Sequence, residues 1–416
     1  MRDGWEEKRL KDILQSPLIY GLNEPAEDEN PEDPRYIRIT DFDENENLRS
    51  NTFKSIPLLK AKNYILKTND ILFARSGATV GKSFLYKSSN GLACFAGYLI
   101  RARLNEKIVS PFFFSYLTKS YYYDNWKGRV NIQSTIQNIS AEKYNQLEFP
   151  LPSLSEQIAI ADYLDKKTAQ IAAQIKLLET KRDTYLRLKK SLINKAVTKG
   201  LNPDVESEES GIDWLGKIPK HWKVKRIKEV FDYVNRGTTP NYVEESPYKV
   251  VNQATFSKGY WDIENIRFTT NNRKDALINK GDLLIASTGG GVLGKVYYVD
   301  FDCDNYYVDS HVTIVRYSNS IRTKFLYYLL NTKYDMINAL FAKGSTNQTE
   351  LQRSQFINFI IPFTEIEEQE MIVNYLDQQS RKIDDIVSNI NQQIGKLQTL
   401  RKSLINEVVT GERSIV

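Results

Sequence analysis

The chain has 416 residues and a mass of 48.1 kDa, which at roughly 150 residues per domain excludes a single small module. Its 57 Lys and Arg against 52 Asp and Glu give a net charge of +5, too small for a histone-like DNA binder but compatible with local basic surfaces. Two cysteines and two histidines without zinc-ligand spacing, and no apolar run near the roughly 20 residues that cross a bilayer, predict a reduced, metal-free cytoplasmic protein.

The first 150 residues alternate short β-rich runs with turn-forming residues. Tyr-Ile-Arg-Ile at 36–39 and Asp-Ile-Leu-Phe-Ala at 70–74 are bounded by Gly, Asn and Ser, as strands of a mixed domain are. An acidic, proline-containing stretch at 24–34 predicts an exposed loop. We therefore predict a globular domain of the α+β class over residues 1–150.

A long helix is predicted over residues 151–200, because proline is absent after the first few of them. Apolar residues recur at every seventh position and predict a coiled-coil seam formed by Leu164, Ile171, Leu178, Tyr185 and Leu192. The second core position of this seven-residue repeat is less regular, since it contains Thr168, Arg182 and Lys189. Such an imperfect seam favours packing on another helix of the same chain over a free-standing parallel dimer.

The same order of elements follows a linker. Gly, Pro, Ser and acidic residues predict the linker over residues 201–221. A second α+β domain is predicted over 222–362, with a strand at 282–286, and a second long helix over 363–416. Its seam is formed by Leu376, Ile383, Ile390, Leu397 and Leu404.

The two halves are copies of one unit. Asp282 lies 212 residues after Asp70, and the identical pentapeptide Lys-Ser-Leu-Ile-Asn occurs at 190–194 and at 402–406 in the same register. A fixed long period predicts a duplicated architecture. We expect two tandem α+β domains separated by two long antiparallel coiled-coil helices, related by an approximate two-fold axis.

A glycine-rich segment follows the predicted strand in each half. Residues 77–83 and 289–296 approach a phosphate-binding P-loop, but the first has one residue too few between its glycines and the second has Val296 where a hydroxyl is required. We therefore expect strand-to-strand loops that bind no nucleotide. Their polar side chains are candidates for contacts to DNA phosphates or bases: Arg75, Ser76, Thr79, Lys82, Ser287, Thr288 and Lys295.

A second pair of polar loops precedes the long helices, at 129–138 and 343–349. Gln and Asn can bond adenine edges, while Arg or Lys can bond guanine or phosphate. The alternative is a polar surface loop held by turn hydrogen bonds. The candidates for DNA contact are Arg129, Gln133, Ser134, Thr135, Gln137, Lys343, Ser345, Thr346 and Gln348.

No set of residues suited to catalysis is found in the sequence. There are no adjacent prolines, so the Asn- or Asp-Pro-Pro-aromatic motif of amino-methyltransferases is missing. Glu179 and Lys181 have the spacing of one end of a nuclease motif but lie within the predicted long helix. Cys303 and His311 fall in a β-like run, where we expect both to pack in a core. We therefore expect a protein that is not an enzyme.

Five segments carry a resemblance to a known family: Leu-Pro-Ser-Leu-Ser-Glu-Gln at 151–157, Ile-Ala-Asp-Tyr-Leu-Asp at 160–165, and residues 190–200, 210–222 and 70–77. Together they resemble the specificity subunit of type I restriction-modification systems. The resemblance implies that the mixed domains are target recognition domains, each reading one half of a split sequence in double-stranded DNA. It also implies that the helices bind two methyltransferase subunits.

The resemblance extends to the partners' chemistry. It implies adenine methylation by the methyltransferase subunits and cleavage by restriction/translocase subunits. S-adenosylmethionine, ATP and magnesium would be used by those partners, with no cofactor in this chain. The alternative is a duplicated, non-enzymatic adaptor that binds two copies of a protein partner through a coiled-coil spacer. Salt-dependent, sequence-selective duplex binding favours the first hypothesis, and salt-insensitive protein binding favours the second.

Overall fold

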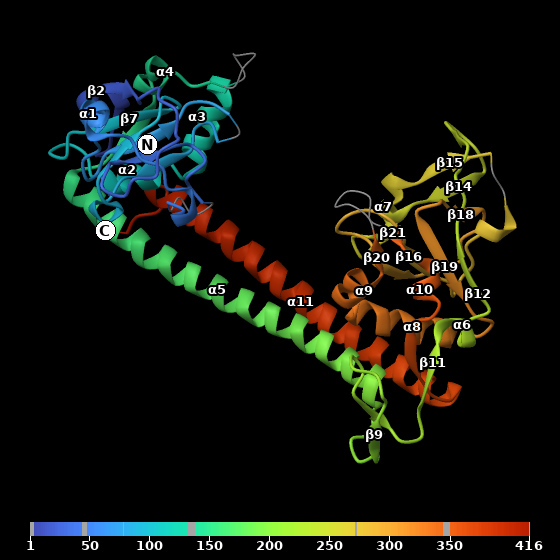
Figure 1. The fold of residues 1–416 in the computed structure, drawn as a ribbon. Helices are drawn as coiled ribbons and strands as arrows, with labels where there is room; N and C mark the ends of the chain where they lie inside the picture. The colour runs from blue at the N-terminus through green and yellow to red at the C-terminus, as the bar shows by residue number, and fades with distance from the viewer. Residues whose placement is uncertain are drawn as a thin grey trace. The chain divides into compact units, whose positions relative to one another are not determined.

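The chain folds into two compact units, each containing an α/β part and a section of both long helices (Figure 1). Unit 1 consists of Met1–Glu179 with Asn391–Val416, and unit 2 consists of Thr180–Ile390. The computed structural model describes residues 4–43, 48–77, 79–131, 138–270, 273–343 and 350–415. The duplicated, mixed α/β fold with long helices is therefore confirmed.

Unit 1 is built around an antiparallel four-stranded sheet in the order β2-β7-β4-β5. All four residues of the central strand β4 are buried, which explains its continuous apolar run. A ladder of β1 with β8 and a parallel pair of β3 with β6 complete the part. The strands are β1 (Glu6–Arg9), β2 (Leu14–Tyr20), β3 (Arg35–Ile37), β4 (Ile71–Ala74), β5 (Ser83–Leu85), β6 (Ala93–Phe95), β7 (Leu99–Leu104) and β8 (Glu148–Leu151). The helices are α1 (Leu58–Ala61), α2 (Pro111–Leu117), α3 (Tyr121–Asn131), α4 (Ala141–Asn145) and the long α5 (Leu154–Lys199).

Unit 2 repeats this plan with a sheet in the order β12-β19-β16-β17. The ladder of β11 with β22 matches that of β1 with β8, and the parallel pair of β14 with β18 matches that of β3 with β6. The strands are β9 (Ser207–Glu209), β10 (Lys217–Pro219), β11 (Lys223–Arg226), β12 (Tyr233–Arg236), β13 (Tyr242–Val243), β14 (Tyr248–Val251), β15 (Arg267–Thr269), β16 (Leu283–Ala286), β17 (Val296–Tyr298), β18 (Tyr306–Val308), β19 (Val312–Arg316), β20 (Ala342–Lys343), β21 (Glu350–Leu351) and β22 (Ile360–Phe363). The helices are α6 (Ile227–Val230), α7 (Gln253–Phe256), α8 (Ser320–Thr332), α9 (Tyr334–Phe341), α10 (Arg353–Phe356) and the long α11 (Ile366–Val409).

A buried ion pair lies at the same place in each sheet. The Asp70 carboxylate accepts two bonds of 2.7 Å from Arg103, and the Asp282 carboxylate accepts bonds of 2.6 and 2.7 Å from Arg316. Each aspartate also accepts a 2.7 Å bond from a backbone N–H three residues earlier. Burial raises the pKa of Asp282 above its usual value despite the neighbouring guanidinium. Both pairs join the start of the central strand to its neighbour in the sheet.

We expect Arg103→Met to lower the free energy of unfolding by about 3–5 kcal/mol, because it leaves a buried carboxylate without its partner. Arg9→Met is the matched control, since Arg9 and Glu148 in their ion pair are 46% and 48% exposed. The control should change the same free energy by less than about 1 kcal/mol. Urea unfolding measures both, and equal losses would contradict a special role for the buried pair.

The two long helices run antiparallel inside each unit. In unit 1 the first part of α5 shares a core with the last part of α11, through Leu164 and Val408. In unit 2 the last part of α5 shares a core with the first part of α11, through Val197 and Leu376. Lys189 adds bonds of 2.7 Å to both carboxylate oxygens of Asp384. All ten predicted seam positions are buried or half-buried.

A tyrosine–aspartate hydrogen bond ties each α/β part to its long helix. The Tyr116 hydroxyl on α2 donates to Asp165 on α5 at 2.5 Å, and the Tyr328 hydroxyl on α8 donates to Asp377 on α11 at 2.5 Å. Burial, followed by the neighbouring carboxylate, raises the pKa of both tyrosines well above the usual range. Both hydroxyls therefore stay protonated and continue to donate at physiological pH.

The segment after α5 is folded against unit 2. Strands β9 and β10 pair as an antiparallel ladder, and the turn between them carries apolar anchors. Leu215 is buried in the core of unit 2, and the Trp214 ring stacks on Phe359 with centroids 5.3 Å apart. The Gly, Ser and acidic composition of this segment does not indicate these contacts.

Candidate nucleic-acid interface

The glycine-rich loop of unit 1 joins β4 to β5. Its ends are closed by backbone bonds from Gly81 N–H to the Ala74 carbonyl at 2.7 Å and from Ala74 N–H to the Lys82 carbonyl at 2.8 Å. Gly81 has a φ of +79°, which favours glycine, and a methyl group there would overlap the Lys127 side chain on α3. The end of the loop at Gly81 is therefore held against α3.

The loop of unit 2 has the same construction between β16 and β17. Gly294 N–H donates to the Ala286 carbonyl at 2.8 Å, and Ala286 N–H donates to the Lys295 carbonyl at 2.9 Å. Gly294 has a φ of +81° and lies against Ile337 of α9. The prediction of strand-to-strand loops is confirmed, since a P-loop would lead into a helix.

The candidate residues of the first loop differ in environment. The Arg75 guanidinium lies over the Tyr20 ring, 4.6 Å from its centroid. Ser76 forms a backbone bridge with Asn138, while Thr79 is half-buried and Lys82 is exposed. Lys82 is therefore the side chain of this loop that is placed most openly for a phosphate.

In the second loop, the predicted DNA-contact residue Ser287 is buried and not exposed. Its side chain is 1% exposed, and its hydroxyl lies 2.6 Å from the Thr313 hydroxyl and bonds to the Ile285 carbonyl at 3.2 Å. It is part of the sheet interior rather than the surface. The neighbouring Thr288 hydroxyl lies 2.7 Å from His311 Nδ1 at an exposed position.

The second pair of candidate loops lies largely outside the described residues. This holds for Gln133, Ser134, Thr135, Gln137, Ser345, Thr346 and Gln348. Lys343 belongs to β20, and Arg129 is exposed near the end of α3. The far ends of both loops are described: Asn138 bridges to Ser76, and Glu350 bridges to Thr288. In each unit the end of the polar loop and the glycine-rich loop therefore meet.

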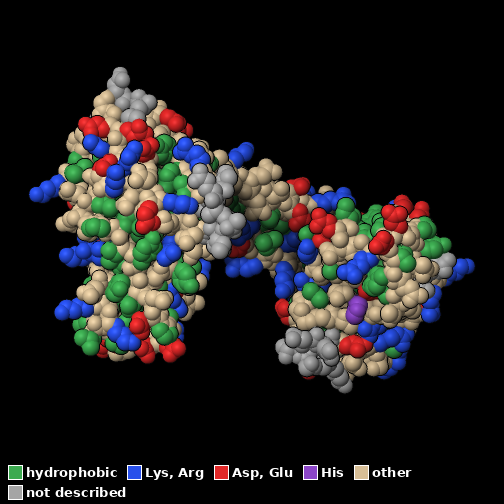
Figure 2. Space-filling view, turned by 90° about the horizontal axis from the view of Figure 1, so that it is seen from above, with side chains coloured by type: hydrophobic (Ala, Val, Ile, Leu, Met, Phe, Trp, Pro, Cys, Tyr) green, Lys and Arg blue, Asp and Glu red, His purple; other side chains and the backbone are tan. Residues whose placement is uncertain are grey.

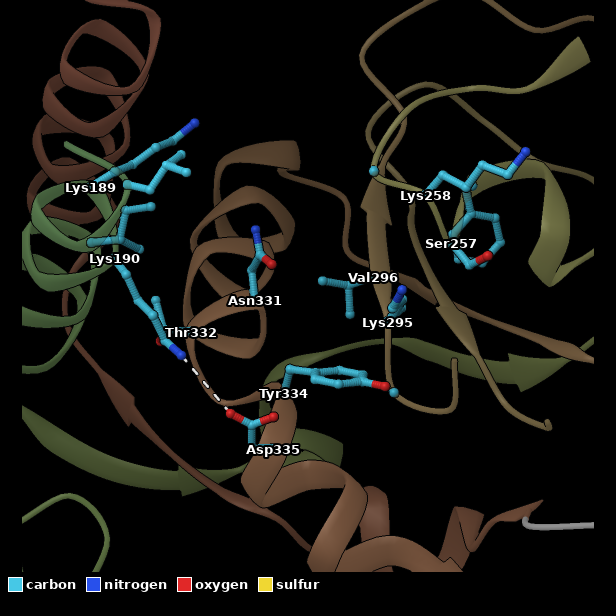
Figure 3. Close-up of a pocket in the computed structure, with 15 residues that line it drawn as sticks. Lys189, Lys190, Ser257, Lys258, Lys295, Val296, Asn331, Thr332, Tyr334 and Asp335 are labelled. Carbon is cyan, nitrogen blue, oxygen red and sulfur yellow. Dashed lines mark ion pairs between the residues drawn. The ribbon is translucent and has the colours of Figure 1, made fainter. Parts of the chain in front are cut away.

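A cavity of about 470 Å³ in unit 2 is lined by lysines from α5, the turn after α7 and the second glycine-rich loop (Figure 3). Their ammonium groups do not converge on one point. Three of them have carboxylate neighbours at 2.7–4.0 Å: Lys189 with Asp384, Lys190 with Asp335, and Lys258 with Asp262. Among the described residues, Lys295 has no carboxylate within 4.0 Å. The cavity therefore offers one uncompensated cation rather than a pocket built for a small anion.

Basic side chains are distributed over the visible surface of both units and are interspersed with acidic ones (Figure 2). This agrees with the net charge of +5. Any contact to a nucleic acid must then come from local groups of residues, such as those around the glycine-rich loops.

The chemistry of the thiols and histidines is partly as expected. Burial raises the pKa of Cys94 to about 12 and that of Cys303 to about 11, so both thiols are poor nucleophiles at neutral pH. Cys303 is buried, as expected, but the prediction for His311 is wrong, because this side chain is exposed at a turn before β19.

In the described part of the chain no group of three or more His, Cys, Asp or Glu is placed to hold a metal ion. No helix within that part is long and apolar enough to cross a bilayer.

Four polar or aromatic side chains beside the loops do not follow from sequence spacing: Tyr20, Tyr98, Arg236 and Glu350. Tyr20 and Arg236 reach the loops through the register of the sheet, Tyr98 through a backbone bond to Arg75, and Glu350 through a bridge to Thr288. Only knowledge of which strands pair, and in what register, would have found them.

Comparison with known proteins gives a consistent result. A family described as type I restriction modification DNA specificity domain matches residues 2–180 and again 219–396. The MjaVIII specificity subunit of a type I restriction enzyme from Methanocaldococcus jannaschii is 24% identical, over 88% of this chain and 84% of its own length. The StySPI specificity subunit from Salmonella potsdam is 22% identical, over 83% of this chain and 75% of its own length.

Solved structures show the same fold. A chain from a study of complex assembly and conformational transition in the type I restriction-modification system aligns with a TM-score of 0.78 at 16% identity, over 99% of both chains. The HsdS subunit from Thermoanaerobacter tengcongensis aligns with a TM-score of 0.54 at 18% identity, over 99% of this chain and 98% of its own.

Proposed function

The chain belongs to the family of type I restriction-modification DNA specificity proteins, and we propose that it selects a two-part DNA sequence for partner subunits to methylate or cut. The observation that supports this most directly is the duplication. Each half matches the family separately, and each holds a polar loop closed by the same backbone bonds between the last two strands of an equivalent sheet. Two equivalent readers on one chain suit a target with two specified halves.

We assign the roles of the segments on this basis. Residues 1–150 and 222–362 are the two target recognition domains, and residues 201–221 join the halves. The helical segments 151–200 and 363–416 bind two methyltransferase subunits, which methylate adenine, and the complex recruits restriction/translocase subunits. The chain itself carries out no catalysis. The duplicated-adaptor hypothesis does not account for the match of both halves to a DNA specificity family.

Binding and methylation assays test this function. The purified chain should bind a duplex carrying its target at least about a thousandfold more tightly than a scrambled duplex at physiological salt. With S-adenosylmethionine alone it should methylate neither duplex, whereas addition of the methyltransferase subunit should methylate the target. Methylation by the chain alone, or equal and salt-insensitive binding of both duplexes, would contradict the proposal.

Phosphate contact by the first glycine-rich loop predicts a defined salt effect. Lys82→Ala should weaken binding to all duplexes to a similar extent and should reduce the slope of log K against log salt by about 0.9. Lys11→Ala is the control, because Lys11 is also exposed in unit 1 but lies outside the loop. Salt titrations of binding measure both slopes, and an unchanged slope for Lys82→Ala would remove this residue from the interface.

A further inference from the structure

Around the glycine-rich loops the two units have the same arrangement of backbone hydrogen bonds, here called the frame, but carry different side chains on it. The first correspondence lies at the end of the central strand of each sheet. One step beyond the β4–β7 ladder, Arg75 N–H donates to the Tyr98 carbonyl at 3.0 Å. One step beyond the β16–β19 ladder, Ser287 N–H donates to the His311 carbonyl at 2.8 Å. Arg75 therefore corresponds to Ser287, and Tyr98 corresponds to His311.

A close backbone approach fixes the next pair of positions. Gly21 and Gly237 each lie against two consecutive carbonyl oxygens of the segment before β7 or β19, and a methyl group at either glycine would overlap both oxygens. Such an approach admits only glycine. The residues immediately before these glycines, Tyr20 and Arg236, therefore correspond.

A third correspondence comes from the ends of the polar loops. Ser76 bridges to Asn138 in unit 1, and Thr288 bridges to Glu350 in unit 2. Each unit thus has one surface corner where three distant segments meet. We define corner 1 as Tyr20, Arg75, Ser76, Tyr98 and Asn138, and corner 2 as Arg236, Thr288, His311 and Glu350.

The frame repeats between the units while the corner side chains do not. Identical residues hold the frame: Gly21 and Gly237, Ala74 and Ala286, Gly81 and Gly294, Lys82 and Lys295. At the corners Arg236 replaces Tyr20, His311 replaces Tyr98 and Glu350 replaces Asn138, while Thr288 takes the place of Ser76. The counterpart of Arg75 is Ser287, which is buried and does not belong to corner 2. A constant frame with exchanged polar side chains suits two readers of different sequences.

Corner 1 contains one donor and one acceptor without a hydrogen-bond partner among the residues that the structure describes. The Nε of Arg75 and the Oδ1 of Asn138 are buried, and neither makes a hydrogen bond to any residue that the structure describes. The Arg75 guanidinium lies over the Tyr20 ring as a cation–π pair, which holds it at this corner. Tyr98 is 62% exposed beside them. Arranged polar groups of this kind indicate a site for a hydrogen-bonding ligand.

Corner 2 has a different hydrogen-bonding character. The Thr288 hydroxyl lies 2.7 Å from His311 Nδ1 and orients the exposed ring, which directs hydrogen bonding with a ligand to Nε2. The Glu350 carboxylate is paired with Arg236 and its side chain is 48% exposed. A carboxylate accepts hydrogen bonds from the amino groups of cytosine or adenine, which a guanine edge in the major groove does not offer.

We propose that corner 1 and corner 2 are the base-reading sites of the two units. This rests on the proposed DNA-specificity function and names the side chains that carry it. The Arg75 guanidinium bonds a guanine edge and Asn138 bonds an adenine edge in one half-site. Glu350 accepts from the amino group of cytosine or adenine in the other half-site, next to His311. Lys82 and Lys295, which are identical, supply phosphate contacts without sequence preference.

Selection from a pool of randomised duplexes tests this assignment with the full chain. The wild type should enrich one motif with two specified halves. Glu350→Gln and His311→Ala should each keep one half of that motif and the spacing. Each should alter the preferred base at one or two positions of the other half by roughly tenfold or more. Tyr98→Ala should alter the opposite half instead.

Glu229→Gln is the matched control, since Glu229 is a 47%-exposed glutamate paired with an arginine in the same unit, away from the corner. It should enrich the wild-type motif. Unchanged motifs for all three corner variants would overturn the assignment of the corners while leaving the proposed function intact. A corner variant that alters both halves, or that loses all preference with an unchanged melting temperature, also overturns it. If the wild type enriches no sequence, the proposed function itself fails.

Discussion

Replacing residues 10–149 with the matching segment of a relative should change one half of the methylated sequence and leave the other half and the spacing unchanged. Several specified base pairs are lost at once, each at a cost of about 1–3 kcal/mol, so methylation at the original sites should fall by roughly a thousandfold or more. Mapping of methylated adenines in cells that also make the partner subunits measures the result.

The structure shows where such an exchange can be made without disrupting the fold. Both ends of the segment leave from the β1–β8 ladder, where Arg9 is paired with Glu148. The inserted segment must keep a tyrosine at position 116, because its hydroxyl donates to Asp165. It must also keep the backbone N–H of residue 110 in place, because this group donates to the Gln157 side-chain oxygen at 2.7 Å. The matched exchange of residues 228–359 should alter only the other half. A change in both halves from either exchange would show that the readers are coupled.

Adding residues to the long helices should change the spacing between the two half-sites and not their bases. Four residues inserted in α5 between Leu178 and Leu192 add about 6 Å at about 1.5 Å per residue. At about 3.4 Å per base pair this corresponds to one or two additional unspecified base pairs. A paired insertion in α11 between Ile390 and Leu404 should recover part of the affinity that is lost when the seam is disturbed.

A seven-residue insertion in both helices is the sharper version of this experiment. It preserves the seven-residue seam and adds about 10 Å, or about three base pairs. Methylation of sites with the original spacing should fall to background, while sites with the longer spacing become methylated. Full activity on the original spacing would mean that the helices do not set the distance between the half-sites.

The helices and the duplication could be predicted because their signals are local or periodic. Heptad positions such as Leu164 and Leu376 are fully buried in the structure, and a seven-residue period survives without knowledge of tertiary contacts. The imperfect second seam position also favoured packing within one chain. Helix α5 followed from these patterns to within three residues at each end, whereas α11 ends seven residues before the predicted 363–416 segment.

The surface corners could not be predicted because they depend on strand register. Tyr98 and His311 lie beside the glycine-rich loops because backbone hydrogen bonds join segments that are far apart in sequence. A pattern of residue types does not show at which residues the pairing of two strands ends. Ser287 follows a strand that is buried on both faces, so no alternation marked its side chain as internal. His311 lies one residue before an apolar run, which made a core position the natural expectation.

Unit 1 owes part of its core to the last residues of the chain. Leu404, Ile405 and Val408 belong to the same apolar cluster as Phe113 and Phe114. On the ribosome this cluster remains incomplete until Leu404, Ile405 and Val408 have been synthesised, whereas unit 2 is contiguous and ends at Ile390. The half made first is therefore completed last, in contrast to the usual N-terminal-first order of folding during synthesis. A nascent chain would expose apolar surface of unit 1 throughout that interval, and a stop codon introduced between Ile390 and Leu404 would remove part of the core of unit 1 while leaving all of unit 2 encoded.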